Sequence, residues 1–259
     1  MVSNVLLLAG CLLNQSAISG PAVASANTRD QLGVPAPLPA QGLLVTPELR
    51  GDIFMARKMF REAVETYKQG PEDSAVIANK TGIAYHQMLE IVVAKKYYQR
   101  AVQLNPAYAE AINNIGTVYY AQKDYGRAIK MYRRALAVTP SSASIYSNLG
   151  TAQFSRKKYK EAFESYQQAL TLDPDVFEHR SSGGQLLQER AVDERAKFHF
   201  YLAKLFAKQG MNDRALLYIR KAIEEGFRER KKLREDPEFS ALQALPEFQE
   251  LLVLEPRVL

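Results

Sequence analysis

The feature that most constrains this chain is a set of small and aromatic residues that recur every 34 positions. Five columns recur in three copies: Gly82, Gly116 and Gly150; Ala94, Ala128 and Ala162; Tyr98, Tyr132 and Tyr166; Ala101, Ala135 and Ala169; Pro106, Pro140 and Pro174. Within a copy, Ala, Tyr and Ala follow at steps of four and three, which places them on one helix face. The proline then ends that helix. Each copy therefore predicts a helix–turn–helix unit that cannot bury its apolar stripe alone, so the copies must stack.

The composition excludes several classes of protein. Apolar residues make up 47% and charged residues 24% of the 259 residues, which excludes a wholly disordered chain and a protein with several membrane spans. The net charge of +6 neither requires nor excludes an acidic partner. The single cysteine excludes an intrachain disulfide and a cysteine metal cluster.

The repeated residues resemble the tetratricopeptide repeat, in which an apolar–Gly pair and an aromatic residue precede Ala, aromatic, Ala and Pro. The copy 109–142 fits this pattern at Ile115, Gly116, Tyr119, Ala128, Tyr132, Ala135 and Pro140. The copies 75–108 and 143–176 fit with one departure each, Thr81 and Gln153. Two degenerate copies flank them. One covers 44–74, where Gly70 and Pro71 shorten the second helix, and the other covers 196–229, which lacks the terminal proline.

The resemblance implies an all-α fold, a right-handed superhelical solenoid of about five repeats over 48–229. Residues 177–195 are surplus to the repeat. They are predicted to extend the following first helix, either as a tolerated insertion or as an element that contacts a partner. Residues 230–259 leave the pattern, and two short helices near Pro237 and Pro246 are predicted to cap the array. No β-sheet is expected.

The N-terminus is predicted to be an export signal. The apolar run 5–13 is too short to span a bilayer but suits a signal peptide. Cleavage after Ala26 would make 1–26 the signal, whereas a lipobox before Cys11 would give a lipid-anchored protein, and absence of export is the third interpretation. Four prolines predict that 27–47 is an extended linker. The expected location is periplasmic or secreted, with attachment to the membrane only through a lipid on Cys11.

The sequence offers little for catalysis. No nucleophile signature accompanies His86, His179 or His199. Ser182-Gly183-Gly184 lacks the flanking residues of a phosphate loop, and no metal-ligand spacing occurs. The basic run 228–234 contains Glu229 and no interleaved aromatic residues, which argues against nucleic acid as a partner. The sequence therefore predicts a non-catalytic protein without cofactor or metal.

The resemblance implies that the first helices line a concave groove that binds a peptide or protein. The residues predicted on this groove face are Asn79, Lys80, Asn113, Asn114, Thr117, Tyr120, Asn148, Thr151, Lys197, Tyr201, Lys204 and Lys208. Asn114 and Asn148 lie 34 apart, and each amide offers a donor and an acceptor to the backbone of an extended peptide. Lys197, Lys204 and Lys208 follow helical spacing and would attract an acidic residue or a terminal carboxylate.

These features predict a scaffold for protein–protein interaction. Two alternatives stay open. One is a lipid-anchored repeat protein that acts in envelope or pilus assembly, and the other is an accessory subunit of an enzyme complex.

Overall fold

The computed structural model describes residues 45–178 and 192–254, which belong to one compact unit. The predicted signal peptide, Cys11, nearly all of the predicted linker and most of the predicted insertion lie outside the described residues. The regular secondary structure of the described ranges is helical throughout. No helix in these ranges combines the length and the apolar character that crossing a membrane requires.

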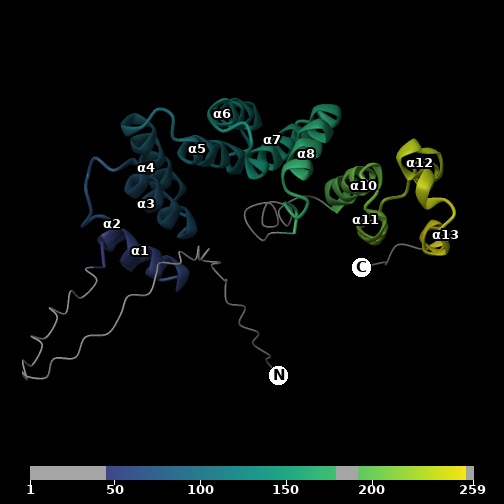
Figure 1. Ribbon diagram of the computed structural model, residues 1–259, viewed down its shortest axis with the longest axis horizontal. Coiled ribbons are helices and arrows are strands. Elements are labelled where there is room, and N and C mark those ends of the chain that lie inside the picture. The colour runs from purple at the N-terminus through teal and green to yellow at the C-terminus, as the bar shows by residue number, and fades with distance from the viewer. Residues whose placement is uncertain (1–44, 179–191, 255–259) are drawn as a thin grey trace, which may run out of the picture. The chain divides into compact units, whose positions relative to one another are not determined.

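Five pairs of helices follow one another along the described chain (Figure 1). The pairs are α1 (Pro47–Ala56) with α2 (Phe60–Tyr67), α3 (Ala75–Gln87) with α4 (Ile91–Leu104), α5 (Ala109–Ala121) with α6 (Tyr125–Val138), α7 (Ala143–Ser155) with α8 (Tyr159–Leu172), and α10 (Val192–Lys208) with α11 (Asn212–Glu224). The two helices of a pair pack on each other, and each second helix packs on the next first helix. This arrangement confirms the predicted all-α solenoid of helix pairs.

Within the pairs from α3–α4 to α7–α8, the glycine column lies against the tyrosine column. A Cβ added to Gly116 would lie 2.6 Å from the ring of Tyr132, and the distance is the same for Gly150 and Tyr166. Both rings are at most 1% exposed. Real Cβ atoms do not approach other atoms so closely, so glycine is required for the ring to enter the space between the two helices.

The turn between the two helices of a pair repeats one backbone conformation. The second residue after the first helix has a positive φ in all five pairs, at Lys58, Leu89, Lys123, Lys157 and Gly210. At Lys123 this conformation lets the backbone N–H donate to the carbonyl of Tyr120 at 2.8 Å, while the next N–H donates to that of Tyr119 at 2.9 Å. Such bonds satisfy the carbonyls at a helix end. Only the last pair uses glycine there.

The chain after α11 folds back on the last pair. It forms α12 (Arg230–Glu235), the 3₁₀ helix η1 (Pro237–Leu242) and α13 (Pro246–Val253). Phe239 and Phe248 are fully buried in the cluster that also contains residues of α10 and α11. The sequence pattern predicted helices at both prolines; the first is 3₁₀, and α12, within the basic run, was not foreseen.

Candidate functional site

The first helices α3, α5 and α7 are joined by the asparagines that were predicted to face a peptide. Asn114 Nδ2 donates to Oδ1 of Asn79 at 2.9 Å, and Asn148 Nδ2 donates to Oδ1 of Asn113 at 3.0 Å. Asn113 and Asn114 complete the series with a longer contact of 3.5 Å. Asn79 and Asn148 are 3% and 5% exposed. We call these four residues the asparagine ladder, and its amides bond to one another from repeat to repeat.

The two threonines that were predicted on the groove face accept hydrogen bonds from residues of the tyrosine column. The hydroxyl of Tyr166 donates to Oγ1 of Thr151 at 3.1 Å, and that of Tyr132 donates to Oγ1 of Thr117 at 3.4 Å. Burying a hydroxyl without a partner costs free energy, so each threonine stabilises its own repeat. Contact of these hydroxyls with a partner protein stays a prediction.

In the copy 75–108, a histidine rather than a threonine is the hydrogen-bond partner of the buried tyrosine hydroxyl. Ile83 stands at the position of Thr117 and offers no acceptor. His86, one turn further along α3, places Nδ1 3.3 Å from the hydroxyl of Tyr98. Burial lowers the pKa of His86, which favours the neutral ring that can accept from a hydroxyl.

Both predicted aromatic residues pack against neighbouring repeats. Tyr120 is 8% exposed, and its hydroxyl lies 3.0 Å from Oγ of Ser155 in α7. Tyr201 stacks on Tyr159 with ring centroids 5.4 Å apart and meets the edge of Phe154 at 5.8 Å. These contacts link α5 with α7 and α10 with the preceding pair.

Two of the four predicted lysines are paired with carboxylates of this chain. Lys80 lies 2.6 Å from Glu48 and 2.7 Å from Asp52, both in α1. Lys204 lies 2.7 Å from Asp236 and 3.4 Å from Glu238, so carboxylates of the C-terminal segment take the place expected for a partner's acid.

The other two predicted lysines are exposed. Lys208 donates to Oε1 of Gln167 at 3.1 Å, and its Nζ lies 5.4 Å from the ring of Phe163. Lys197 lies in α10 on the same side as Lys208. These two residues keep positive charge accessible on α10.

A surface accessible to a partner therefore lies beside the ladder. We call it the first-helix face and define it by side chains of α3, α5, α7 and α10 that are exposed or partly exposed. They are Val76, Lys80, Glu110, Asn113, Asn114, Thr117, Ser144, Lys197, Tyr201 and Lys208.

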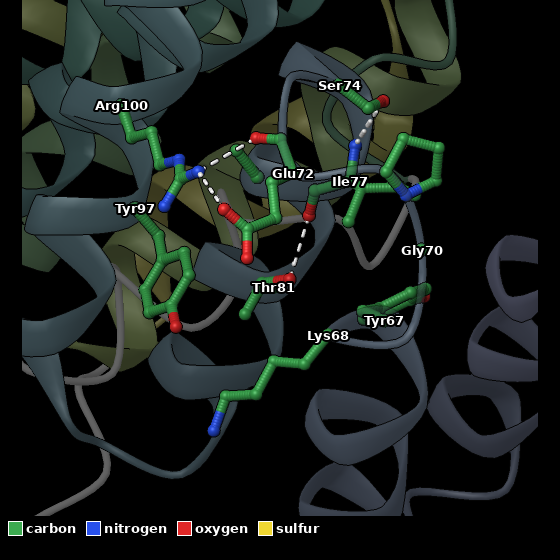
Figure 2. A pocket seen from close by; sticks show the side chains of 11 residues that line it. Tyr67, Lys68, Gly70, Glu72, Ser74, Ile77, Thr81, Tyr97 and Arg100 are labelled. Carbon is green, nitrogen blue, oxygen red and sulfur yellow. Dashed lines mark hydrogen bonds and ion pairs between the residues drawn. The ribbon is translucent and has the colours of Figure 1, made fainter.

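A pocket that the sequence did not reveal lies where α2 ends. Its volume is about 270 Å³, and residues from α2, the following loop, α3 and α4 line it (Figure 2). Lys68 and Arg100 bring positive charge to it, and Glu72 brings a carboxylate. The shortened second helix was visible in the sequence through Gly70 and Pro71, but the space that this shortening leaves was not inferred.

The described ranges contain no group of three or more His, Cys, Asp and Glu side chains arranged to hold a metal ion. His179 and Cys11 lie outside these ranges. Near α10, His199 Nδ1 lies 2.8 Å from Glu225 Oε2, and Arg195 Nε lies 3.3 Å from Glu225 Oε1. Burial lowers the pKa of His199 although Glu225 acts to raise it, and the cluster ties α10 to α11.

Comparison with known proteins finds a family match in the middle of the array. Residues 108–175 match the tetratricopeptide repeat family, and this range holds the two helix pairs from α5 to α8. These two pairs are tetratricopeptide repeats, and the pairs α1–α2, α3–α4 and α10–α11 outside the match have the same helix–turn–helix arrangement.

Solved structures of the protein MamA are similar to this chain. One shares 21% identity with a TM-score of 0.47 and covers 71% of this chain and 96% of its own. Another, from Desulfovibrio magneticus RS-1, shares 19% identity with a TM-score of 0.48 and covers 69% and 92%. No curated protein matches the chain.

Proposed function

We propose that the chain is a non-catalytic scaffold that binds a segment of a partner protein on the first-helix face. The observation that carries this proposal is the asparagine ladder, which ties α3, α5 and α7 together with hydrogen bonds of 2.9 and 3.0 Å. A surface that is ordered before binding loses little conformational entropy when a partner arrives. The ladder therefore supports binding by holding the face in place.

The side chains of this face indicate a polar partner segment. Glu110 and Ser144 are exposed on α5 and α7, and Lys197 and Lys208 are exposed on α10. Asn113 and Asn114 stay partly exposed and keep further donor and acceptor capacity beyond the ladder bonds. Such side chains suit hydrogen bonds to an extended backbone together with a few charge contacts.

Substitution within the ladder would be a poor test of binding. Changing Asn114 and Asn148 to alanine together removes two bonds between repeats, so weaker binding could follow from a loosened array. Exposed positions of the first-helix face avoid this difficulty.

The test is site-specific photo-cross-linking in extracts of the native host. A photoreactive residue is placed at Glu110, Ser144 or Lys197, and matched controls carry it at Lys130, Arg133 or Lys160 on the exposed sides of second helices. We expect one recurring adduct from the first three positions and none from the controls, with mass spectrometry to identify it. Equal labelling from both sets, or none from either, would reject the first-helix face as the binding surface.

Export also belongs to this proposal and is supported by the apolar run 5–13 alone. N-terminal sequencing of the mature protein tests it. A first residue of Asn27 supports cleavage after Ala26, a blocked, lipid-modified Cys11 supports the anchored alternative, and an intact Met1 contradicts export.

A further inference from the structure

The pocket at the end of α2 has its origin in a helix that stops early. α2 has 8 residues, whereas α4, α6 and α8 have 14 each. In the next repeat, α4 continues past Tyr98, and Ala101 is fully buried in a cluster with Ala78 and Ala111. After Tyr67, in contrast, Gly70 and Pro71 turn the chain out of the helix. The space that a continued helix would fill remains open.

The lining of the pocket combines an apolar wall with hydrogen-bond donors. Tyr67 and Ile77 supply apolar surface, while Lys68, Tyr97 and Arg100 supply donors. Burial raises the pKa of Tyr97, and the positive charges of Lys68 and Arg100 act against this rise. All three side chains line the pocket. Sites for drug-sized molecules measure about 300–1,000 Å³. At about 270 Å³ this pocket suits a single side chain better than a whole cofactor.

Glu72 shows how a carboxylate meets these donors. Arg100 Nη2 donates to the backbone oxygen of Glu72 at 2.9 Å and lies 3.7 Å from its carboxylate (Figure 2). The Glu72 side chain is 91% exposed and that of Arg100 is 48% exposed. An ion pair so open to water contributes little to stability. A second carboxylate that enters from outside can therefore replace that of Glu72 at Arg100.

We propose that this pocket receives an acidic side chain from an extended segment of a partner protein. Its carboxylate pairs with Arg100 and with Lys68, and its methylene groups pack against Ile77. Lys68 Nζ now lies 3.0 Å from the carboxylate of Glu65, in a pair that is likewise open to water and can be replaced in the same way. The proposal rests on the scaffold function for the existence of a protein partner, and it adds a contact on α2–α4 that is separate from the first-helix face.

The test is a titration of the ¹⁵N-labelled full chain followed by NMR. The probe is N-acetyl-glutamate N-methylamide, which presents a glutamate side chain within peptide-like groups. We expect saturable shifts at the amides of Lys68, Gly70, Ser74 and Arg100. The matched glutamine derivative has the same shape without the charge and should produce none of them. Propionate serves as a free carboxylate without a peptide backbone and should bind more weakly.

Charge variants give effects of opposite sign. Arg100→Gln and Lys68→Gln should each weaken binding of the glutamate probe by about two- to fivefold, the range of an exposed ion pair. Glu72→Gln removes the carboxylate that competes at Arg100 and should tighten binding by about the same factor, which a general loosening of the loop would not do. Arg134→Gln is the matched control. Arg134 lies 34 residues after Arg100 and likewise donates to a loop carbonyl, that of Pro106 at 3.3 Å, so its loss should leave affinity unchanged.

Equal shifts with the glutamine probe, or unchanged affinity in Arg100→Gln, Lys68→Gln and Glu72→Gln, would overturn the proposal. Propionate that binds as tightly as the glutamate probe would make this a site for small carboxylates and would overturn the peptide partner. The pocket and the first-helix face can fail separately, because the probe tests only the pocket and the cross-links test only the face.

Discussion

The repeats from α3 to α7 and the segment from α10 to α13 are held together by different chemistry. In the first region, the buried clusters consist of Ala, Ile, Leu, Val and Tyr, and the asparagine ladder links neighbouring repeats. In the second, the rings of Phe198, Phe200, Phe239 and Phe248 belong to the largest cluster of the described chain. Phe200 stacks on Phe227 with ring centroids 4.4 Å apart.

The difference shows what each region must accomplish. An internal repeat has the same neighbour on both sides, so a fixed set of small residues and one tyrosine fits each junction. The last pair has no following repeat, and a short irregular segment must cover its apolar stripe. Large aromatic rings bury much area per residue, which lets about two dozen residues accomplish this.

The largest expected effect comes from the aromatic region. Phe239 is fully buried, with Phe200 at 5.8 Å and Phe248 at 6.2 Å. Phe239→Ala should lower the free energy of unfolding by about 3–5 kcal/mol. Hydrogen exchange should show that the lost protection is concentrated in α10–α13, because distant repeats unfold partly independently. Phe239→Leu is the control and should cost less. Equal loss of protection in α3–α6 would contradict a separation between the two regions.

The glycine–tyrosine junction of the array should respond next most strongly. Gly116→Ala places a methyl group 2.6 Å from the ring of Tyr132 and should cost about 1–3 kcal/mol in chemical denaturation. Gly126, in α6, is a matched control, since a Cβ there would meet nothing nearer than 3.7 Å. Gly126→Ala should be neutral or stabilising by up to about 1 kcal/mol. A Gly116→Ala protein as stable as the parent would contradict the close packing.

The ladder should contribute less. Asn79→Ala removes the acceptor for Asn114 and should cost about 1 kcal/mol in the free energy of unfolding. A double-mutant cycle of Asn79 with Asn114 should give a coupling energy of about 0.5–1.5 kcal/mol. The cycle of Asn79 with Asn148, which are not bonded to each other, serves for comparison and should give nearly none. Equal coupling energies in the two cycles would contradict a specific hydrogen bond between Asn79 and Asn114.

The smallest effect is expected at the turns. Lys123 has a φ of 59°, whereas Gly210 occupies the equivalent turn of the last pair. Glycine adopts positive φ without steric cost but loses more entropy on folding. Lys123→Gly should therefore raise the free energy of unfolding by less than about 1 kcal/mol, and Gly210→Ala should lower it by a similar amount. A destabilised Lys123→Gly protein would show that its side chain contributes more than its backbone costs.

The sequence predicted the helix pairs because their determinants recur in register. Gly116 is needed because the ring of Tyr132 lies against it. The same pair of columns recurs in three copies, which makes the pattern recognisable in the sequence. The turns could not be predicted, because Lys58, Leu89 and Lys123 carry no signal for a positive φ. Their conformation follows from the need to close a short connection between packed helices.

The candidate site was predicted less well than the fold. Asn114 and Asn148 are 34 apart, but each donates to an asparagine 35 positions earlier, and the repeat spacing alone does not reveal these partners. Likewise, the sequence around Lys204 does not predict its ion pairs, because Asp236 and Glu238 lie more than 30 residues later in the chain. The end of α2 was foreseen from Gly70 and Pro71, but the pocket depends on three-dimensional packing around the missing turns.

The tyrosine column has one more consequence. The hydroxyls of Tyr67, Tyr98, Tyr132 and Tyr166 meet Asp52, His86, Thr117 and Thr151, and each partner comes from the same helix pair as its ring. Each of these four hydroxyls thus has its hydrogen-bond partner inside its own helix pair. A pair such as 109–142 could therefore be duplicated or deleted without leaving any of these four hydroxyls unbonded, so the tyrosine hydroxyls do not fix the number of repeats.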